Sequence, residues 1–338
     1  MAAKPVRQRR CLYISEDGGV RLPQHRHSGV DDSYLYIYFC SPLADALVSL
    51  VPLWVAPNLI TLLGVAASAL HHILVRVYSP SLQETCPPWV WLVGALSLFA
   101  YQTLDNMDGK QARRTQSSSP LGVFVDHTAD ALNTVLLPFQ SLAVGQLGNP
   151  GPWQRWGCLS CVGGLFSMFF FATWEEYFTG TLYFGVFNGP TDGVLMLSSV
   201  YLLTFLHGDQ TVLFNSEVFG LALAPAILVF YAIWSLFTIL LTVRAVAKTC
   251  KDHAELASAL NLAAPFVLLS AGFAVLLVSP LGADADLRTL IWFFGLGFLL
   301  LVTPLHLAHL TGDPYRPWRY MLLILVCLLV TWQFGSLV

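Results

Sequence analysis

Charged residues are scarce in this sequence. Only 11% of its 338 residues are Asp, Glu, Lys or Arg, whereas 56% are hydrophobic and the mean hydropathy is +0.63. A soluble domain carries about a quarter charged residues. The composition therefore argues against a soluble protein and indicates a polytopic membrane protein. The net charge is only −3, and there is no zinc-finger pattern or basic helix, so we do not expect nucleic-acid binding.

The seven cysteines lack a metal-binding pattern. Cys158 and Cys161 have CxxC spacing, but they lie in an apolar stretch and no second pair accompanies them. A structural zinc site needs about four ligands. We interpret these two cysteines as small apolar packing residues.

Several sequence motifs of well-known enzyme classes are also missing. There is no P-loop, no Rossmann glycine pattern, no Ser-His-Asp spacing and no GxGD motif of an intramembrane aspartyl protease. The N-terminus is polar and basic, without the apolar core of a signal peptide. We expect residues 1–40 to form a cytosolic tail.

Long apolar windows predict an all-α bundle of about nine transmembrane helices, within a range of eight to ten. Pro225 lies inside the sixth window and predicts a kink or a split there. The expected spans are residues 58–78, 89–107, 121–147, 153–174, 191–207, 217–246, 256–279, 287–309 and 318–337.

The stretch before the first span, SPLADALVSLVPLW, has apolar residues at helical spacing, including Leu43, Leu47 and Leu50. It could form an amphipathic helix in the membrane interface, or a plain connector. We expect residues 41–250 to form a catalytic transmembrane domain and residues 251–338 to add C-terminal membrane helices.

The basic residues predict the orientation of the bundle. With the N-terminus in the cytosol and nine spans, all but three of the 17 Lys and Arg residues fall on the cytosolic side, as the positive-inside rule requires. The exceptions are Arg76, Arg155 and Arg288. This orientation places the connection between the second and third spans at the cytosolic face.

Four aspartates lie around that connection. Asp105 and Asp108 are three residues apart at the end of the second span, and Asp126 and Asp130 are four apart at the start of the third. Both spacings place a pair on one helix face. A carboxylate in the bilayer centre costs about 2.5–3.5 kcal/mol, and bound divalent cations would offset that cost. Oxygen ligands favour Mg²⁺, with Mn²⁺ as a substitute, and a pair of such ions suits phosphoryl chemistry.

The neighbouring residues fit a phosphate-bearing substrate. Gly109, Ala112 and Gly122 are small and permit close approach to the helices, and Arg113 could bind phosphate oxygens in bidentate fashion. His127 adjoins the third aspartate and could accept a proton near neutral pH, or could only orient a metal ligand. The alternative for the aspartates is that they cap helix ends and pair with Lys110, Arg113 and Arg114.

Two further segments are candidates for the substrate cavity. Trp174 and Glu175, in the segment WEEY, offer an aromatic face and a carboxylate for a cationic amino alcohol, or form part of an aromatic belt. Tyr101 lies one helical turn before the first aspartate and could line the same cavity. We interpret His306 and His309 as packing residues rather than cavity residues.

The segment from Asp105 to Asp130 resembles the signature of the CDP-alcohol phosphotransferases, D-x-x-D-G-x-x-A-R-x₈-G-x₃-D-x₃-D. The segments PLWVAPNLITLLG, SPLG and WEEYFTGTLYFG extend the resemblance, over about residues 45–192, to the eukaryotic choline/ethanolamine phosphotransferases. The eight fixed signature positions are Asp105, Asp108, Gly109, Ala112, Arg113, Gly122, Asp126 and Asp130.

The resemblance implies a specific reaction. Such enzymes transfer phosphocholine or phosphoethanolamine from CDP-choline or CDP-ethanolamine to diacylglycerol, release CMP and form phosphatidylcholine or phosphatidylethanolamine. It implies that the four aspartates bind two Mg²⁺ or Mn²⁺ ions, that His127 accepts the proton, and that Asn58 and Arg113 contact the CDP moiety. It also suggests a homodimer in the endoplasmic reticulum or Golgi membrane, with the active site facing the cytosol.

Two other functions remain open at this point. A CDP-diacylglycerol-dependent phosphatidyltransferase would use the same signature with another donor. A cation transporter would use the aspartates as an ion site. The sequence leaves the choice between choline and ethanolamine undecided.

Overall fold

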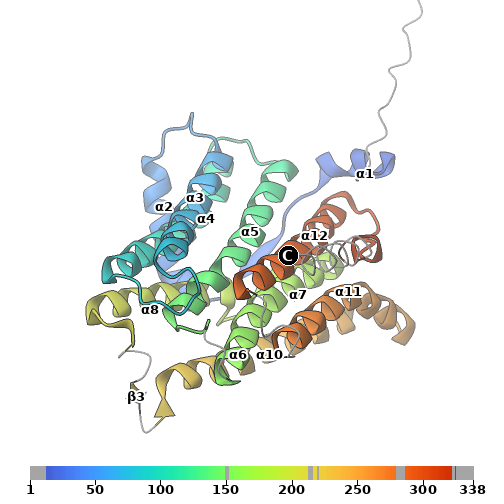
Figure 1. Ribbon diagram of the computed structural model, residues 1–338. Helices are drawn as coiled ribbons and strands as arrows, with labels where there is room; N and C mark the ends of the chain where they lie inside the picture. Colours follow the sequence, from blue (N-terminus) through green and yellow to red (C-terminus); the bar gives the residue numbers. More distant parts are fainter. Residues whose placement is uncertain are drawn as a thin grey trace, which may run out of the picture.

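Long helices make up most of the chain, as the computed structural model shows for residues 13–148, 152–211, 216–218, 221–278, 286–321 and 324 (Figure 1). The prediction of an all-α fold is confirmed. Helices overlap each of the first eight expected spans, although the sixth begins with two short strands, and the ninth lies largely outside the described residues. The expected number of spans therefore stays a prediction. The long helices are α3 (Pro57–Tyr78), α4 (Pro88–Arg114), α5 (Pro120–Val144), α7 (Gly164–Thr179), α8 (Val194–His207), α10 (Leu223–Thr249), α11 (His253–Val278) and α12 (Leu287–Thr311).

Local sequence signals explain where these helices begin and end. Proline occupies the first position of α3, α4 and α5, where its missing N–H has no partner to lose. α6 (Pro152–Cys158) also begins with proline, and a π-helical turn at Leu159–Gly163 joins it to α7. α7 and α12 end at Gly180 and Gly312, which have φ of 76° and 65°. Glycine adopts this left-handed conformation without the steric cost that other residues carry.

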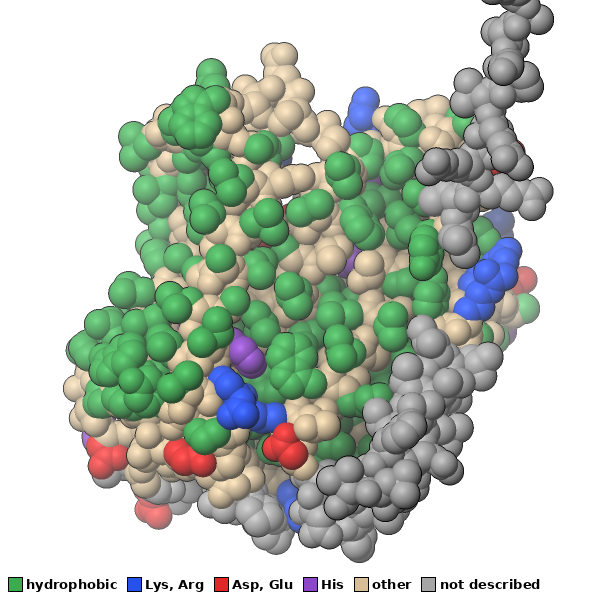
Figure 2. Space-filling model, turned by 45° about the horizontal axis from the view of Figure 1, so that its top comes forward, with side chains coloured by type: hydrophobic (Ala, Val, Ile, Leu, Met, Phe, Trp, Pro, Cys, Tyr) green, Lys and Arg blue, Asp and Glu red, His purple; other side chains and the backbone are tan. Residues whose placement is uncertain are grey.

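The exposed surfaces of the helices are those of a membrane protein. Among the described residues, six helical segments are long and apolar enough to cross a membrane. One of them, residues 225–249 in α10, is mostly exposed: only 11% of its most apolar stretch is buried within the chain. Hydrophobic side chains cover most of the face shown in Figure 2, whereas charged side chains gather near its lower edge. Exposed apolar helix faces need lipid around them. The chain is therefore a polytopic integral membrane protein.

The helices α4 and α5 do not belong to those six apolar segments, although they are 27 and 25 residues long. At 1.5 Å per residue, each is about 37–41 Å long, which is more than enough to cross the roughly 30 Å hydrocarbon core of a bilayer. These are the two helices that carry the four aspartates. α3 packs against both of them, and α12 packs against α5 and α7.

The prediction of a kink at Pro225 is wrong. The helix α10 begins at Leu223, so Pro225 lies in its first turn and breaks no helical hydrogen bond. The chain before it forms two short antiparallel strands, β3 (Glu217–Val218) and β4 (Leu221–Ala222).

Stacked aromatic rings hold the C-terminal helices to α7. The ring centroids of Phe170 and Phe266 are 4.2 Å apart, and those of Phe166 and Phe298 are 4.9 Å apart. All four side chains are buried. Such pairs add about 0.5–1.5 kcal/mol each beyond the burial of their area, so this contact fixes α11 and α12 beside the site helices.

The described part of the N-terminal tail is folded onto the bundle. It contains α1 (Glu16–Arg21), a 3₁₀ turn at Leu22–Gln24, the strand β1 (Gly29–Asp31) and a π-helical turn at Tyr36–Cys40 that leads into α2 (Ser41–Leu50). β1 pairs in parallel with β2 (Leu182–Phe184), directly after α7. The helix expected before the first span is therefore present as α2, and its place in the membrane interface stays a prediction.

Arg288 confirms which helix ends share a side of the bundle. It is buried at the start of α12, and its Nε donates to the carbonyl oxygen of Pro80 at 2.6 Å, just after the end of α3. Its NH2 donates to the carbonyl oxygen of Ser79 at 2.6 Å. The start of α12 and the end of α3 therefore lie together, as the alternating spans predict.

Candidate metal and phosphate site

The aspartates of α4 and α5 converge in space. Asp105, Asp126 and Asp130 each offer a carboxylate oxygen, and these oxygens lie within 4.8 Å of one another. The Oδ1 atom of Asp126 is buried without a hydrogen-bond partner among the described residues. An unsatisfied buried carboxylate oxygen beside two other carboxylates fits a cation ligand. The oxygen-only donor set favours a hard divalent cation.

Two hydroxyl groups orient this carboxylate cluster. The Tyr101 hydroxyl donates to Oδ1 of Asp130, and the Thr61 hydroxyl on α3 donates to Oδ2 of Asp108. Tyr101 and Asp108 are buried. Gly64 on α3 lies against the tyrosine, since a Cβ there would be 3.4 Å from the Tyr101 ring. Tyr101 therefore lies at the cluster, and its expected place in the substrate cavity stays a prediction.

The turn between α4 and α5 brings the two pairs to the same end of the bundle. Gln116, at φ 55°, ends the turn after α4. Ser119 then caps α5 by accepting a hydrogen bond from the Gly122 N–H at 3.1 Å. This cap fixes the direction of α5 as it leaves the turn.

The basic residues of α4 have different partners. Lys110 forms an ion pair with Asp45 on α2 at 2.8 Å, and Arg114 donates to the carbonyl oxygen of Val48 at the end of α2. The proposed pairing of Lys110 and Arg114 with the four aspartates is therefore wrong. Arg113 is exposed, and no ion pair is recorded for it in the described part of the chain.

The remaining signature residues lie beside the cluster. A Cβ at Gly109 would be 3.6 Å from NH1 of Arg113, so the guanidinium group lies next to this small residue. A Cβ at Gly122 would be 3.7 Å from Oδ1 of Asn58, which brings the start of α3 next to the start of α5. Ala112, one turn after Asp108 on α4, is half-buried.

A second group of ionisable side chains surrounds His127, which is buried. Its Nδ1 lies 3.3 Å from Nδ1 of His306 and 3.9 Å from Oε2 of Glu176. The other carboxylate oxygen, Oε1 of Glu176, lies 3.7 Å from Nδ1 of His27 and 3.5 Å from Nε2 of His309. We call these five residues the histidine–glutamate cluster.

The sequence-based interpretation missed most of this cluster. His306 and His309 were expected to pack in the core, yet they face His127 and Glu176 from α12. Their i, i+3 spacing on one helix face was the available signal. Glu176 lies in the candidate segment WEEY, but nothing in the sequence distinguishes it from Glu175. His27 carried no signal, because only the fold brings the N-terminal segment against the end of α7.

Trp174 and Glu175 lie apart from these clusters. Trp174 is fully buried, and its Nε1 donates to the carbonyl oxygen of Ala259 on α11 at 3.1 Å. Its ring meets Phe171 and Phe178 edge-on. Glu175 accepts a hydrogen bond from Thr242 on α10. The structure brings neither of them to the aspartates, and Glu176 is the acid of this segment that faces His127.

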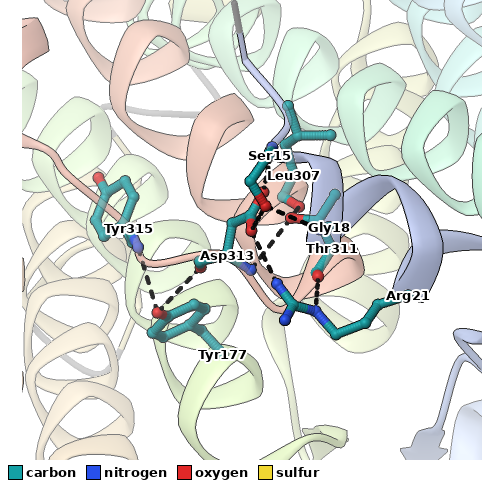
Figure 3. Close-up of polar contacts among 8 residues, drawn as sticks. All are labelled: Ser15, Gly18, Arg21, Tyr177, Leu307, Thr311, Asp313 and Tyr315. Atoms are coloured by element: carbon teal, nitrogen blue, oxygen red, sulfur yellow. Dashed lines mark hydrogen bonds and ion pairs between the residues drawn. The ribbon is translucent and has the colours of Figure 1, made fainter. Parts of the chain in front are cut away.

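Figure 3 shows how the N-terminal segment is anchored at the end of α12. Ser15 donates through its N–H at 2.9 Å and through its hydroxyl at 2.5 Å to the carboxylate of Asp313. Arg21 pairs with the same carboxylate at 2.9 Å and donates to the carbonyl oxygen of Thr311 at 2.7 Å. Tyr177 at the end of α7 donates to the carbonyl oxygen of Asp313 at 3.4 Å.

A second anchor lies beyond β1. Asp31 accepts hydrogen bonds from the Asn188 side-chain amide at 2.9 Å and the Thr191 hydroxyl at 2.7 Å, and Ser33 donates to Asp192 at 3.1 Å. His25 and His27 lie between the two anchors. Burial lowers the pKa of His27, and the charges of His25 and Arg113 lower it further. The N-terminal segment thus passes close to both the arginine and the histidine–glutamate cluster.

The fold and the site define a class of protein: a polytopic integral membrane protein with a carboxylate cluster suited to metal ions at the ends of two transmembrane helices. A family model for CDP-alcohol phosphatidyltransferases matches residues 54–222, half of the chain. The chain belongs to this family.

Curated relatives have similar sequences. Choline/ethanolaminephosphotransferase 1 of Arabidopsis thaliana is 34% identical over 320 residues, which are 89% of this chain and 80% of that protein. Choline/ethanolaminephosphotransferase 2 of the same plant is 42% identical over 199 residues, 59% of this chain and 49% of that protein. Cholinephosphotransferase 1 of Xenopus laevis is 41% identical over 207 residues, 59% of this chain and 49% of that protein. The match thus covers only about half the length of some relatives.

Proposed function

We propose that this protein transfers phosphocholine, phosphoethanolamine or both from the CDP-alcohol to diacylglycerol, forming phosphatidylcholine or phosphatidylethanolamine and releasing CMP. The observation that carries the proposal is the convergence of Asp105, Asp126 and Asp130 within the membrane domain. The names of the relatives, choline/ethanolaminephosphotransferase and cholinephosphotransferase, suggest the substrates.

The four aspartates are proposed to hold two Mg²⁺ or Mn²⁺ ions. When bound, such ions stabilise negative charge on the transferring and leaving phosphate oxygens. The protein's part is to fix the carboxylates: Tyr101 orients Asp130, and Thr61 orients Asp108. These hydrogen bonds hold the ligand atoms in place before substrate arrives, which lowers the cost of organising the site.

The CDP moiety is proposed to bind between Arg113 and Asn58. Arg113 is exposed and lies over Gly109, so its guanidinium group is free to bind phosphate oxygens in bidentate geometry. Asn58 lies beside Gly122 on the facing helices. The small residues Gly109, Ala112 and Gly122 leave space for the nucleotide between these groups.

His127 is proposed to accept the proton of the diacylglycerol hydroxyl. Its Nδ1 faces Glu176 and His306, so Nε2 is the nitrogen left for the substrate. The hydroxyl oxygen forms a bond to the phosphorus that bears the amino alcohol, and the bond from that phosphorus to the CMP oxygen breaks. An acidic partner at Nδ1 stabilises the imidazolium that results.

The orientation and setting of the enzyme form part of the proposal. Residues 41–250 would form the catalytic domain, with its site facing the cytosol, because Lys110, Arg113 and Arg114 follow the positive-inside rule. The endoplasmic reticulum or Golgi membrane and a homodimer are proposed from the family resemblance. Diacylglycerol would enter from the lipid between the apolar helix faces.

The first test is formation of radiolabelled lipid by the purified protein in detergent with diacylglycerol. CDP-choline and CDP-ethanolamine would be offered in parallel, with Mg²⁺, Mn²⁺ or EDTA. We expect metal-dependent product that Asp126→Ala abolishes. No product from either donor, with the protein folded, would overturn the proposal. CDP-diacylglycerol and ion flux would then test the phosphatidyltransferase and transporter alternatives.

A further inference from the structure

The histidine–glutamate cluster contains a buried acid without a hydrogen bond. Glu176 is fully buried, and neither of its carboxylate oxygens has a hydrogen-bond partner in the described ranges. Three imidazole nitrogens surround these oxygens at 3.5–3.9 Å, too far for hydrogen bonds. A buried carboxylate without partners costs several kcal/mol unless something positive lies beside it.

The separations fit ligands that share one ion. Nitrogen and oxygen ligands about 2.0–2.1 Å from a tetrahedral Zn²⁺ ion lie about 3.3–3.4 Å from each other. Nδ1 of His27, Nδ1 of His127 and a carboxylate oxygen of Glu176 all lie within 4.8 Å of one another. His309 reaches the same carboxylate from α12. His309 is not part of this group of three, so its side chain would have to shift to complete a tetrahedral set.

The ligand types favour a different metal from the one expected at the aspartates. Imidazole suits Zn²⁺ and other transition metals, whereas Mg²⁺ requires oxygen ligands. A set of three histidines and one glutamate is of the kind that binds zinc in proteins. The two clusters should therefore discriminate between Mg²⁺ and Zn²⁺ by donor chemistry.

We propose that His27, His127, Glu176 and His309 form a Zn²⁺ site that is separate from the aspartate cluster and inhibits the enzyme when occupied. Three ligands come from the helices α5, α7 and α12, and the fourth comes from the N-terminal segment held at Asp313 and at β2. The inhibition rests on the proposed function: a zinc-bound His127 in this cluster is no longer free to accept the substrate proton.

The test of binding does not depend on activity. Purified protein in excess Mg²⁺ would be dialysed against Zn²⁺, and the bound metal examined by X-ray absorption, which recognises imidazole ligands. We expect one zinc per chain with imidazole scattering, and at least ten-fold weaker binding in His27→Ala and Glu176→Gln. His253→Ala is the matched control, since His253 is an exposed histidine at the start of α11.

A replacement of one ligand by another distinguishes the loss of a zinc ligand from misfolding of the variant. Cysteine is also a zinc ligand, so His27→Cys should restore binding and add a sulfur scatterer at about 2.3 Å. Zinc bound only through oxygen ligands, or binding unchanged in both His27→Ala and Glu176→Gln, would overturn the site. Failure of His27→Cys to restore zinc would overturn the assignment of His27 as a ligand.

Enzyme activity provides a second test, which addresses the inhibitory role of the zinc site. In excess Mg²⁺, Zn²⁺ should inhibit lipid formation at the concentration that fills the imidazole site, and His27→Ala should need at least ten-fold more zinc for the same inhibition. Zinc that fills the site without slowing the reaction would overturn the inhibitory role. A protein that binds zinc through imidazole but makes no lipid would instead disprove the proposed function.

Discussion

Tyr101 donates its hydroxyl hydrogen bond to Asp130, across the space between α4 and α5. A hydrogen bond to a charged group contributes about 1.5–3 kcal/mol. We predict that Tyr101→Phe lowers kcat/KM about ten-fold to one-hundred-fold and raises the Mg²⁺ concentration required for half-maximal rate. Tyr34→Phe, at an exposed tyrosine, is the control. An unchanged metal requirement would show that Tyr101 does not position a ligand.

Asp126 has a buried oxygen for which the described structure offers no hydrogen-bond donor. Because a cation is the partner proposed for this oxygen, Asp126→Asn should remove at least about 99.9% of the activity while the protein keeps its size-exclusion profile. It should also be no less stable than the wild type without metal, since it removes a buried charge. Asp252→Asn, at the exposed cap of α11, keeps an oxygen that can accept the Glu255 N–H and should change neither property.

Arg113 and Arg114 are neighbours that allow a matched comparison. Arg113 has no ion pair among the described residues, whereas Arg114 is hydrogen-bonded to the end of α2. Arg113→Ala should raise KM for the CDP-alcohol at least ten-fold with little change in melting temperature, because it removes a phosphate ligand. Arg114→Ala should lower the melting temperature and leave KM unchanged, since Arg114 holds the carbonyl oxygens at the end of α2. A higher KM in Arg114→Ala together with a lower melting temperature in Arg113→Ala would contradict both assignments.

The contact of Asp313 with the N-terminal segment predicts a specific pH dependence. Burial alone would raise the pKa of this carboxyl, but the hydrogen bonds from Ser15 and the charge of Arg21 hold its pKa below the usual value of 3.8. The stabilisation is therefore present above pH 3.8 and is lost as the pH falls through the lowered value. The protection of the amides of residues 15–21 against hydrogen exchange, expressed relative to the intrinsic rate at each pH, should stay constant between pH 5 and 8.

A substitution should reproduce this loss at neutral pH. Asp313→Asn removes the charge that Arg21 pairs with, so residues 15–21 should exchange faster at pH 7. Asp209→Asn, at an exposed position shortly after α8 and far along the chain from residues 15–21, is the control. Slow exchange in Asp313→Asn would mean that β1 alone holds the segment.

Trp174 tests the choice of headgroup. Its ring is enclosed by Phe171, Phe178 and α11, and no open face is left for a cationic amino alcohol. Trp174→Phe should therefore leave the ratio of phosphatidylcholine to phosphatidylethanolamine unchanged. It should lower the melting temperature, because it removes a buried hydrogen bond and buried area. A shift in the product ratio would restore the headgroup role first suggested by the sequence.

The sequence was sufficient to predict the helices and the pairing of the aspartates, because both depend on local patterns. Apolar length predicts α3 to α12, and the i, i+3 and i, i+4 spacing predicts which carboxylates share a face. The hydroxyl of Thr61 could not be foreseen, because its contact with Asp108 depends on how α3 packs against α4.

The histidine–glutamate cluster could not be predicted from the sequence either, because it too depends on how distant parts of the chain pack together. Its members come from four separate parts of the chain, and no short-range pattern links His27 to Glu176. In WEEY the two glutamates look equivalent, yet successive helical positions differ in direction by about 100°. Only the packing of α7 decides that Glu175 meets α10 while Glu176 meets His127.

The two anchors of the N-terminal segment also set an order of events during synthesis. Residues 15–33 leave the ribosome first, but their partners at 182–192 and at Asp313 are made much later. Contacts between such distant residues form late. The segment must therefore wait undocked until α7 and β2 have been made, and its anchor at Asp313 forms only after α12 is complete.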